Sequence, residues 1–420
     1  MFKIKRPKRD TTILSGDPCE NRGLDEVLQL KVEGGELPVS PVCDSNFVDT
    51  SSVEFENNYS PTELLDDQSA NAEDLVNELY PPVEDSGFRA LKSRILLKWS
   101  VDDWIQLISG GSGVKPKDHD VFLKMYHTQS QKLPISYGLE FYPLGAKNTS
   151  FGAGFKQGDG REGQNRSKGA TWIFKNAVQD KRWVKPGGDF LEKDSEGNQI
   201  HVKKQYDFED PDINVNIKDV FNYWKEHENN GLLIKFSKEV EDLKSDSFGS
   251  DNFTDPTELF FFGSLSHTIY KPELLLGFDD HEWNTSGADM LLYNDRLKLT
   301  ISNLEDEFFE GEKIRLRVNV TERYQNKKYL DRDNYHKNKR TPKFLPEGSL
   351  KYSIEDNIAG KTIIPFSKYS QLSFDPNGYY FDLDLTNFYP ERTYEIKFKF
   401  DDPVGGFEEI YDNKHKFKVK

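Results

Sequence analysis

The stretch "RWVKPGGDF" (residues 182–190) raises the question that decides the fold. It combines a tryptophan, a proline, two adjacent glycines and an acid. If the stretch is a binding loop, the glycines let the backbone approach a phosphate or a sugar, and Asp189 is a ligand or a catalytic acid. If it is only a turn, the same residues are architecture. The rest of the chain has to discriminate between these two interpretations.

The composition favours β-structure in two compact units. The chain has 420 residues, which is long for a single hydrophobic core. It contains 30 Phe, 19 Tyr and 6 Trp but only 3 Met, and polar and apolar residues alternate along much of its length. We therefore expect an all-β protein with two domains.

The acidic charge is concentrated in one segment. The net charge is −16, yet residues 32–88 hold fourteen Asp and Glu residues and no Lys or Arg, so the rest of the chain is nearly neutral. We therefore interpret residues 35–86 as an extended acidic insertion. Its apolar points suit docking on a partner with a basic surface, although a solvated, disordered loop is the alternative. The docking residues that we expect are Leu64, Leu65, Leu75, Leu79 and Tyr80.

Several classes of protein are disfavoured by the sequence. No stretch reaches the ~20 apolar residues of a membrane span, and no apolar segment follows the basic start of the chain. Cys19 and Cys43 have no metal-binding or redox spacing, so we expect no disulfide and assembly in a reducing cytosol. Basic runs such as residues 333–343 are short and scattered, which argues against a nucleic-acid partner.

Strand patterns fill residues 87–280, with one helix among them. The helix is predicted after "DINVNI", with Asp219 as its N-cap and Gly231 available for its C-terminal cap. Val220 and Trp224 lie one turn apart, so Trp224 is expected to point inward. Residues 281–420 alternate cleanly in several strands and contain no confident helix, which is typical of an immunoglobulin-like or fibronectin-like sandwich.

The order of the pieces in the first region resembles a known family, the DNRLRE-type β-sandwich domain, a jelly-roll relative of carbohydrate-binding modules. The pieces that carry the resemblance occur in chain order at residues 1–34 and 87–280, with the insertion 35–86 between them. They are "RDTTI", "NRGLDEVLQL", "SRILLKW", "GATW", "RWVKPGGDF", "INVNIKDVFNYW", "NNGLLIKFS", "ELFFFG" and "YKPELLLGFDD". The sequence "SHTIYKPELLLGFDD" (residues 266–280), followed by a second sandwich, is similar to sequences of virion structural proteins of tailed bacteriophages.

The resemblance implies an architectural role for the opening stretch. Trp172 and Trp183 would be buried anchors of a long loop that folds back over the sandwich. Gly187 and Gly188 would supply a turn with positive φ, and Asp189 would accept backbone N–H hydrogen bonds. The remaining signature positions are Tyr270 and Pro272 in "YKPELLLGFDD".

No catalytic motif stands out in the sequence. The nucleophile elbow G-x-S-x-G and the zinc motif H-E-x-x-H are both missing, and the histidines are dispersed. A pair of carboxylates for glycoside hydrolysis cannot be recognised in one dimension. Tyr126, Tyr137 and Tyr142 could form a sugar-stacking platform, but each suits a core position better. We expect no enzymatic activity, no cofactor and no metal.

These observations lead to one functional expectation and one alternative. The expectation is a non-enzymatic structural protein of a tailed-bacteriophage virion, in the tail, baseplate or neck region, assembled in the host cytoplasm. Its partners would be other virion proteins, including further copies of itself, rather than nucleic acid or membrane. The alternative is a glycan-binding adhesin or carbohydrate-binding module.

Overall fold

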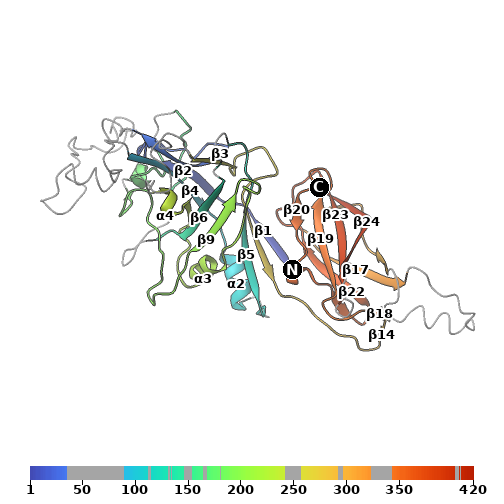
Figure 1. The fold of residues 1–420 in the computed structure, drawn as a ribbon. Helices are drawn as coiled ribbons and strands as arrows, with labels where there is room; N and C mark the ends of the chain where they lie inside the picture. The colour runs from blue at the N-terminus through green and yellow to red at the C-terminus, as the bar shows by residue number, and fades with distance from the viewer. Residues whose placement is uncertain are drawn as a thin grey trace, which may run out of the picture. The chain divides into compact units, whose positions relative to one another are not determined.

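The fold is all-β, as the composition predicts. It was analysed in a computed structural model (Figure 1). The residues that the structure describes are 1–35, 89–111, 115–130, 133, 135–145, 154–163, 168–179, 181–241, 257–291, 297–322, 343–402, 406 and 408–420. Within these residues, no helix is both long and apolar enough to cross a membrane.

Two compact units share the chain. Unit 1 consists of Met1–Ile4, Gln106–Asp120 and Leu275–Lys420, and unit 2 consists of Lys5–Ile105 and Val121–Leu274. The domain boundary expected at 280/281 thus lies a few residues beyond the division at 274/275, and two short segments from the first part of the chain belong to unit 1. Four elements cross the division, namely β1 (Phe2–Lys5), α2 (Asp102–Ser109), β5 (His119–Met125) and β13 (Glu273–Phe278).

Unit 2 is built on a large, mainly antiparallel sheet. Its order is β12-β3-β4-β11-β6-β9, with β2 paired to β4, while β10 pairs with β5. The strands are β2 (Arg9–Leu14), β3 (Val27–Gly35), β4 (Arg89–Lys98), β6 (Ser136–Pro143), β9 (Val202–Asp207), β10 (Ile213–Asn216), β11 (Leu232–Phe236), β12 (Thr257–Phe262) and the short β7 (Phe174–Asn176) and β8 (Lys181–Arg182). The helical segments are η3 (Ala177–Gln179), α3 (Lys218–Glu226) and α4 (Lys238–Glu241).

The centre of this sheet is covered on both faces. Successive side chains of a strand point to opposite faces, yet every residue of β11, "LLIKF", is buried. Leu233 is opposite Leu96 of β4 and Tyr142 of β6, and these residues form one face. The sheet therefore needs a second layer over that face, and the long loop between β6 and β9 supplies it.

The acidic stretch is looped out between two strands that pair with each other. β3 and β4 are antiparallel, and their register places Gly35 opposite Arg89. The chain thus leaves and re-enters the sheet at one place. The predicted docking residues Leu64, Leu65, Leu75, Leu79 and Tyr80 lie outside the described residues.

Helix α3 forms where it was predicted, but its caps were not predicted correctly. Its N-cap is Ile217, which has no side-chain cap, so Asp219 is not the N-cap and lies in the first turn instead. There its negative charge interacts favourably with the positive end of the helix dipole, without forming a capping hydrogen bond. The helix ends at Glu226 with His227 as C-cap, so Gly231 does not cap it. Trp224 is buried, as expected from its spacing to Val220.

Gly231 has a different reason to be glycine. It precedes β11 with φ +120°, and a Cβ there would lie 2.8 Å from the carbonyl oxygen of Leu97.

The helix α2 was not predicted at all. Its sequence "DDWIQLIS" buries Trp104 and Ile108, one turn apart, within a segment too short for a clear helical period.

Unit 1 contains two larger sheets, coloured orange to red in Figure 1. Their orders are β15-β17-β22-β21 and β16-β24-β23-β19-β20, and β14 pairs with β18. The elements are β14 (Asp289–Met290), β15 (Leu297–Ile301), β16 (Glu307–Phe308), β17 (Lys313–Glu322), β18 (Lys343–Phe344), β19 (Leu350–Asp356), β20 (Thr362–Ile364), η4 (Lys368–Ser370), β21 (Ser373–Asp375), β22 (Gly378–Asp384), β23 (Arg392–Asp401) and β24 (Glu408–Val419).

Aromatic side chains join the two sheets of unit 1. Tyr352 of β19 stacks on Phe381 of β22 with ring centroids 4.2 Å apart, and Phe381 also meets Phe398 of β23 edge-on. All three are buried. This packing of two mainly antiparallel sheets is the sandwich that the alternating strands predict.

One sequence-based expectation about the cysteines was wrong. Cys19 is disulfide-bonded, whereas its spacing to Cys43 indicated no bond. The spacing rules for metal and redox motifs detect cysteines close in sequence and do not detect a bond that closes a longer loop. Cys43 lies outside the described residues.

Candidate functional site

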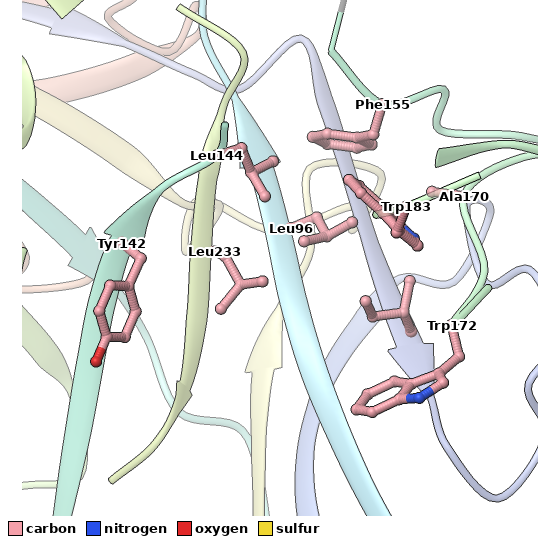
Figure 2. Close-up of a cluster of buried hydrophobic side chains, with 9 residues drawn as sticks. Leu96, Tyr142, Leu144, Phe155, Ala170, Trp172, Trp183 and Leu233 are labelled. Atoms are coloured by element: carbon pink, nitrogen blue, oxygen red, sulfur yellow. The ribbon is translucent and has the colours of Figure 1, made fainter. Parts of the chain in front are cut away.

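The loop "RWVKPGGDF" covers the face of the unit 2 sheet formed by Leu96, Leu233 and Tyr142. Trp172 and Trp183, predicted as buried anchors, are 3% and 5% exposed. Figure 2 shows the Trp183 ring beside Phe155 and the Trp172 ring farther along, both on the same side of the strand that carries Leu96. Trp183 donates a hydrogen bond from Nε1 to the carbonyl oxygen of Thr171, at 2.9 Å. The tryptophans therefore form an interior layer and do not line an open cleft.

The adjacent glycines are required by close packing as well as by conformation. Gly187 and Gly188 have φ of +91° and +97°. A Cβ on Gly187 would lie 2.6 Å from Cζ2 of Trp172, and a Cβ on Gly188 would lie 2.7 Å from Cδ1 of Leu233. The backbone of the loop thus lies directly on the aromatic and aliphatic layer beneath it.

Asp189 closes the turn instead of facing a substrate. It is 6% exposed, and its two carboxylate oxygens accept hydrogen bonds from the backbone N–H groups of Val184 and Lys185, each at 2.9 Å. Burial raises the pKa of Asp189, and these two donors partly offset that effect. Of the two interpretations of the stretch, this geometry fits the turn.

A row of charges lies beneath the same loop, and all of them except Lys203 are buried. Arg94 of β4 forms a bidentate ion pair with Glu241 of α4, at 2.9 and 2.8 Å. Lys235 of β11 contacts Glu140 of β6 at 2.7 Å, and Lys203 of β9 contacts the other oxygen of Glu140 at 2.7 Å. The strand register places Lys235 opposite Glu140 and Glu140 opposite Lys203. The charges therefore run across four neighbouring strands, β4, β11, β6 and β9.

Arg94 also holds the loop itself. Its Nη1 donates to the carbonyl oxygen of Gly187 at 2.7 Å, and its guanidinium lies 5.0 Å from the ring centroid of Trp172. Gly187 in turn donates from its backbone N–H to the carbonyl oxygen of Trp172 at 2.7 Å. One cation thus joins the sheet, the turn and the first aromatic anchor.

The two carboxylates of this row have the wrong environment for acid–base catalysis. Glu140 and Glu241 both approach Lys235, at 2.7 and 3.7 Å, which brings them within the range of a glycosidase pair. They are 2% and 4% exposed. Burial opposes ionisation of Glu140, but hydrogen bonds from Lys203 and Lys235 outweigh it and lower its pKa to about 2. A general acid needs the opposite shift and access to solvent.

Glu241 behaves in the same way. Burial again opposes its ionisation, and the charges of Arg94 and Lys235 outweigh burial and lower its pKa. Buried ion pairs of this kind fix one arrangement of the surrounding structure, because removing one partner leaves an uncompensated charge in the interior.

Sequence reasoning missed this charged row, although a signal for it was present. Each charge is a single ionisable residue inside an apolar strand, namely Arg94 in "SRILL", Glu140 in "YGLEFYP" and Lys235 in "LLIKF". A charge at such a position has to find a partner on a neighbouring strand. The partner cannot be identified before the strand order is known.

Tyr137 and Tyr142 occupy core positions, which the sequence favoured over a sugar platform. Tyr137 and Tyr142 are 2% and 1% exposed, and Tyr142 donates from its hydroxyl to Glu140 at 2.8 Å. Tyr126 is half-buried and meets Tyr270 edge-on, with ring centroids 5.3 Å apart, and Tyr270 also stacks on Phe262. The signature residue Pro272 follows this small aromatic cluster directly in the chain and is buried.

Unit 2 contains two further groups of polar side chains, a His127–Ser130 contact and a charged cleft. His127 Nε2 lies 2.6 Å from Ser130 Oγ, but Asp212 accepts from the backbone N–H of His127, so its Oδ1 is used by the main chain. A cleft of about 220 Å³ is lined by Arg22, Lys31, Glu33 and Glu162, whose charges pair with one another or with close neighbours. Over the described ranges, no three His, Cys, Asp or Glu side chains gather in a way that could hold a metal.

Comparisons with known proteins identify no family. No family model and no curated protein matches the chain. Among solved structures, a DUF4785 family protein from Legionella pneumophila is 11% identical with a TM-score of 0.18, over 71% of this chain and 54% of that protein. Salmonella alpha-2-macroglobulin reacted with methylamine is 10% identical with a TM-score of 0.19. This chain is covered to 99% in that comparison but spans only 19% of the Salmonella protein.

The role of the adjacent glycines can be tested by substitution. Gly187→Ala is expected to lower the free energy of unfolding by about 3 kcal/mol, because the new methyl group both strains the backbone and overlaps the Trp172 ring. Gly197→Ala is the matched control, since Gly197 has φ +92° with nothing within 4 Å of its Cβ position. It should lose only the conformational part, about 1 kcal/mol. Equal losses in urea unfolding would show that close packing is not the reason for glycine at 187.

The charged row predicts a pH dependence of stability. The pKa of Glu140 is lowered from 4.5 to about 2 on folding, so its ionised form stabilises the protein above the ordinary pKa of glutamate, and this contribution is lost as the pH falls toward about 2. Glu140→Gln should cost about 3 kcal/mol at pH 7 and should flatten the fall in melting temperature between pH 5 and pH 2.5. The exposed Glu196→Gln serves as the control and should leave the profile unchanged. An unchanged slope in Glu140→Gln contradicts the assignment.

Proposed function

We propose that this protein is a non-enzymatic structural component of a tailed-bacteriophage particle, in the tail, baseplate or neck. It holds neighbouring subunits by protein–protein contacts. The resemblance of the sequence to virion proteins suggests the particle, and the use of Trp172, Trp183 and Asp189 for architecture supports a role without catalysis. The sheets are the rigid bodies of this proposal, and the acidic stretch is its docking segment.

The observation that carries the proposal is the place of the acidic stretch in the β3–β4 pair. Strand pairing continues up to Gly35 and Arg89, which are opposite each other. A short turn would close this hairpin, so the sheet itself does not need the residues between. A segment with thirteen carboxylates, interspersed with apolar residues and not required by the sheet, is suited to binding another protein.

The docking role predicts a separation of folding from assembly. Replacing residues 36–88 by an Asn-Gly turn between Gly35 and Arg89 also removes Cys43, so the deletion is made together with Cys19→Ser and is compared with Cys19→Ser alone. It should leave the melting temperature within a few degrees of that reference, because the β3–β4 register is kept. The same deletion, introduced into the phage, should abolish incorporation of the protein into particles. Normal incorporation, measured by quantitative mass spectrometry of purified virions, would refute the docking role.

The particle itself is tested by the same measurement on wild-type virions. The proposed function expects peptides of this protein in purified particles at a fixed ratio to the major structural proteins. Their absence from particles of a phage that encodes the protein would overturn the proposal, whatever the deletion does.

Glycan binding is the second candidate, and one observation favours it. The residues Tyr126, Phe262 and Tyr270 form an aromatic cluster and are each only half-buried. An aromatic surface of this kind can stack on a pyranose ring. Binding to a glycan array that is lost in Tyr270→Ala would favour this function over the structural one.

A further inference from the structure

Unit 2 carries a basic face beside the Gly187–Gly188 turn. It consists of the segment around Lys156, the strands β7 and β8 with their connection, and the loop that follows Trp183. The backbone N–H of Lys156 donates to the carbonyl oxygen of Lys175 at 2.9 Å, and β7 pairs with β8. These neighbouring segments hold five cationic residues, namely Lys156, Lys175, Lys181, Arg182 and Lys185.

Three of the five cations of this face have no carboxylate partner among the described residues. Lys156, Lys181 and Lys185 are exposed, and across the described part of the chain no carboxylate pairs with any of the three. Asp189 lies close to Lys175, but its oxygens are occupied by the N–H groups of the turn. Burial lowers the pKa of Lys175, Asp189 partly offsets this, and the charge of Lys181 lowers it further. Lys156, Lys181 and Lys185 thus contribute three positive charges without a carboxylate partner in the described residues, while Asp180 of the β7–β8 connection lies outside those residues.

Apolar side chains are exposed among these cations. Val178, in the η3 turn between β7 and β8, is 45% exposed, and Val184, between Trp183 and Lys185, is 65% exposed. The two valines add apolar contact area beside the exposed lysines, so a partner that covers this face needs both carboxylates and apolar side chains. The matching partner is acidic and carries apolar side chains at intervals.

The chain contains a segment with that chemistry. Residues 36–88 combine carboxylates with apolar residues, as in "PTELLDD" and "AEDLVNELY", and contain no Lys or Arg. Extended out and back from the sheet, a segment of this length reaches about 80 Å, which is about twice the diameter of a domain the size of unit 2. It can therefore contact a neighbouring molecule.

We infer that this basic face is the docking surface for residues 36–88 of a second copy of the same protein. The inference rests on the proposed function, because neighbouring copies in a particle are held at high local concentration. Carboxylates of the incoming segment pair with Lys156, Lys181 and Lys185, and its apolar side chains cover Val178 and Val184. Each copy then offers both halves of the contact, which permits a ring or a chain of subunits.

Isotope-mixed cross-linking of the full-length protein tests the direction of the contact. Equal amounts of ¹⁴N and ¹⁵N protein are mixed and treated with a carbodiimide, which joins a carboxylate to an amine without a spacer. Digestion uses a protease specific for acidic residues, because no Lys or Arg lies between Lys31 and Arg89. Cross-links between residues 36–88 and Lys156, Lys181 or Lys185 are expected, and about half of them should join a light to a heavy chain.

Charge reversal tests the surface. Lys156→Glu/Lys181→Glu/Lys185→Glu is compared with Lys117→Glu/Lys193→Glu/Lys238→Glu, which changes the net charge equally at exposed lysines elsewhere. Sedimentation at low salt should show self-association of the wild type and of the control, weakened about tenfold or more in the first variant and by high salt. Melting temperatures verify that both variants are folded.

Four outcomes would overturn the inference. The first is that cross-links join only chains of the same isotope, which would place the segment on its own copy. The second is that the wild type does not self-associate, and the third is that the two triple variants self-associate equally. The fourth is that a labelled duplex DNA binds through the three lysines while no light–heavy cross-link forms, which would assign the face to nucleic acid. None of these outcomes affects whether the protein occurs in particles. Failure of the inference is thus separable from failure of the proposed function.

Discussion

The contact between Arg94 and the Gly187 turn determines how unit 2 is built. A guanidinium in the middle of a sheet has to be both neutralised and covered, because an unpaired buried charge is far more costly than a paired one. Glu241 supplies the opposite charge, while the carbonyl oxygen of Gly187 and the Trp172 ring cover the remaining donors and the guanidinium plane. The loop approaches closely enough to do this only because positions 187 and 188 lack side chains. The interior thus explains the sequence of the turn.

Much of this fold was accessible from the sequence, and the parts that were not have a common physical cause. The strands of both units follow from alternation, since the side chains of a strand face opposite sides of a sheet. The burial of Trp224 follows from its helical spacing. The caps predicted for α3 were wrong because the helix begins directly after strand β10, so Ile217 becomes the N-cap and Asp219 falls in the first turn. Arg94, Glu140 and Lys235 were not connected because each finds its partner on another strand, and strand order is tertiary information.

The same distinction applies to the candidate site. Composition alone left "RWVKPGGDF" open between a binding loop and a turn. The burial of Trp183 and the two N–H donors of Asp189 exclude a solvent-facing carboxylate at that position. What sequence reasoning could not supply was the location of the unpaired positive charge, because Lys156 and Lys181 are far apart in the chain and are brought together by β7.

The distribution of charge in unit 2 separates stability from recognition. Inside, each carboxylate of the row below the loop is matched by two cations at hydrogen-bond or ion-pair distance, so these charges leave nothing for a partner. Outside, the lysines on the outer surface of the same loop lack carboxylate partners in the described residues, while the acidic stretch has no cations of its own. In the proposed array, each copy would supply the charge that its neighbour lacks. The loop that closes the core would then also be the surface that faces the next subunit.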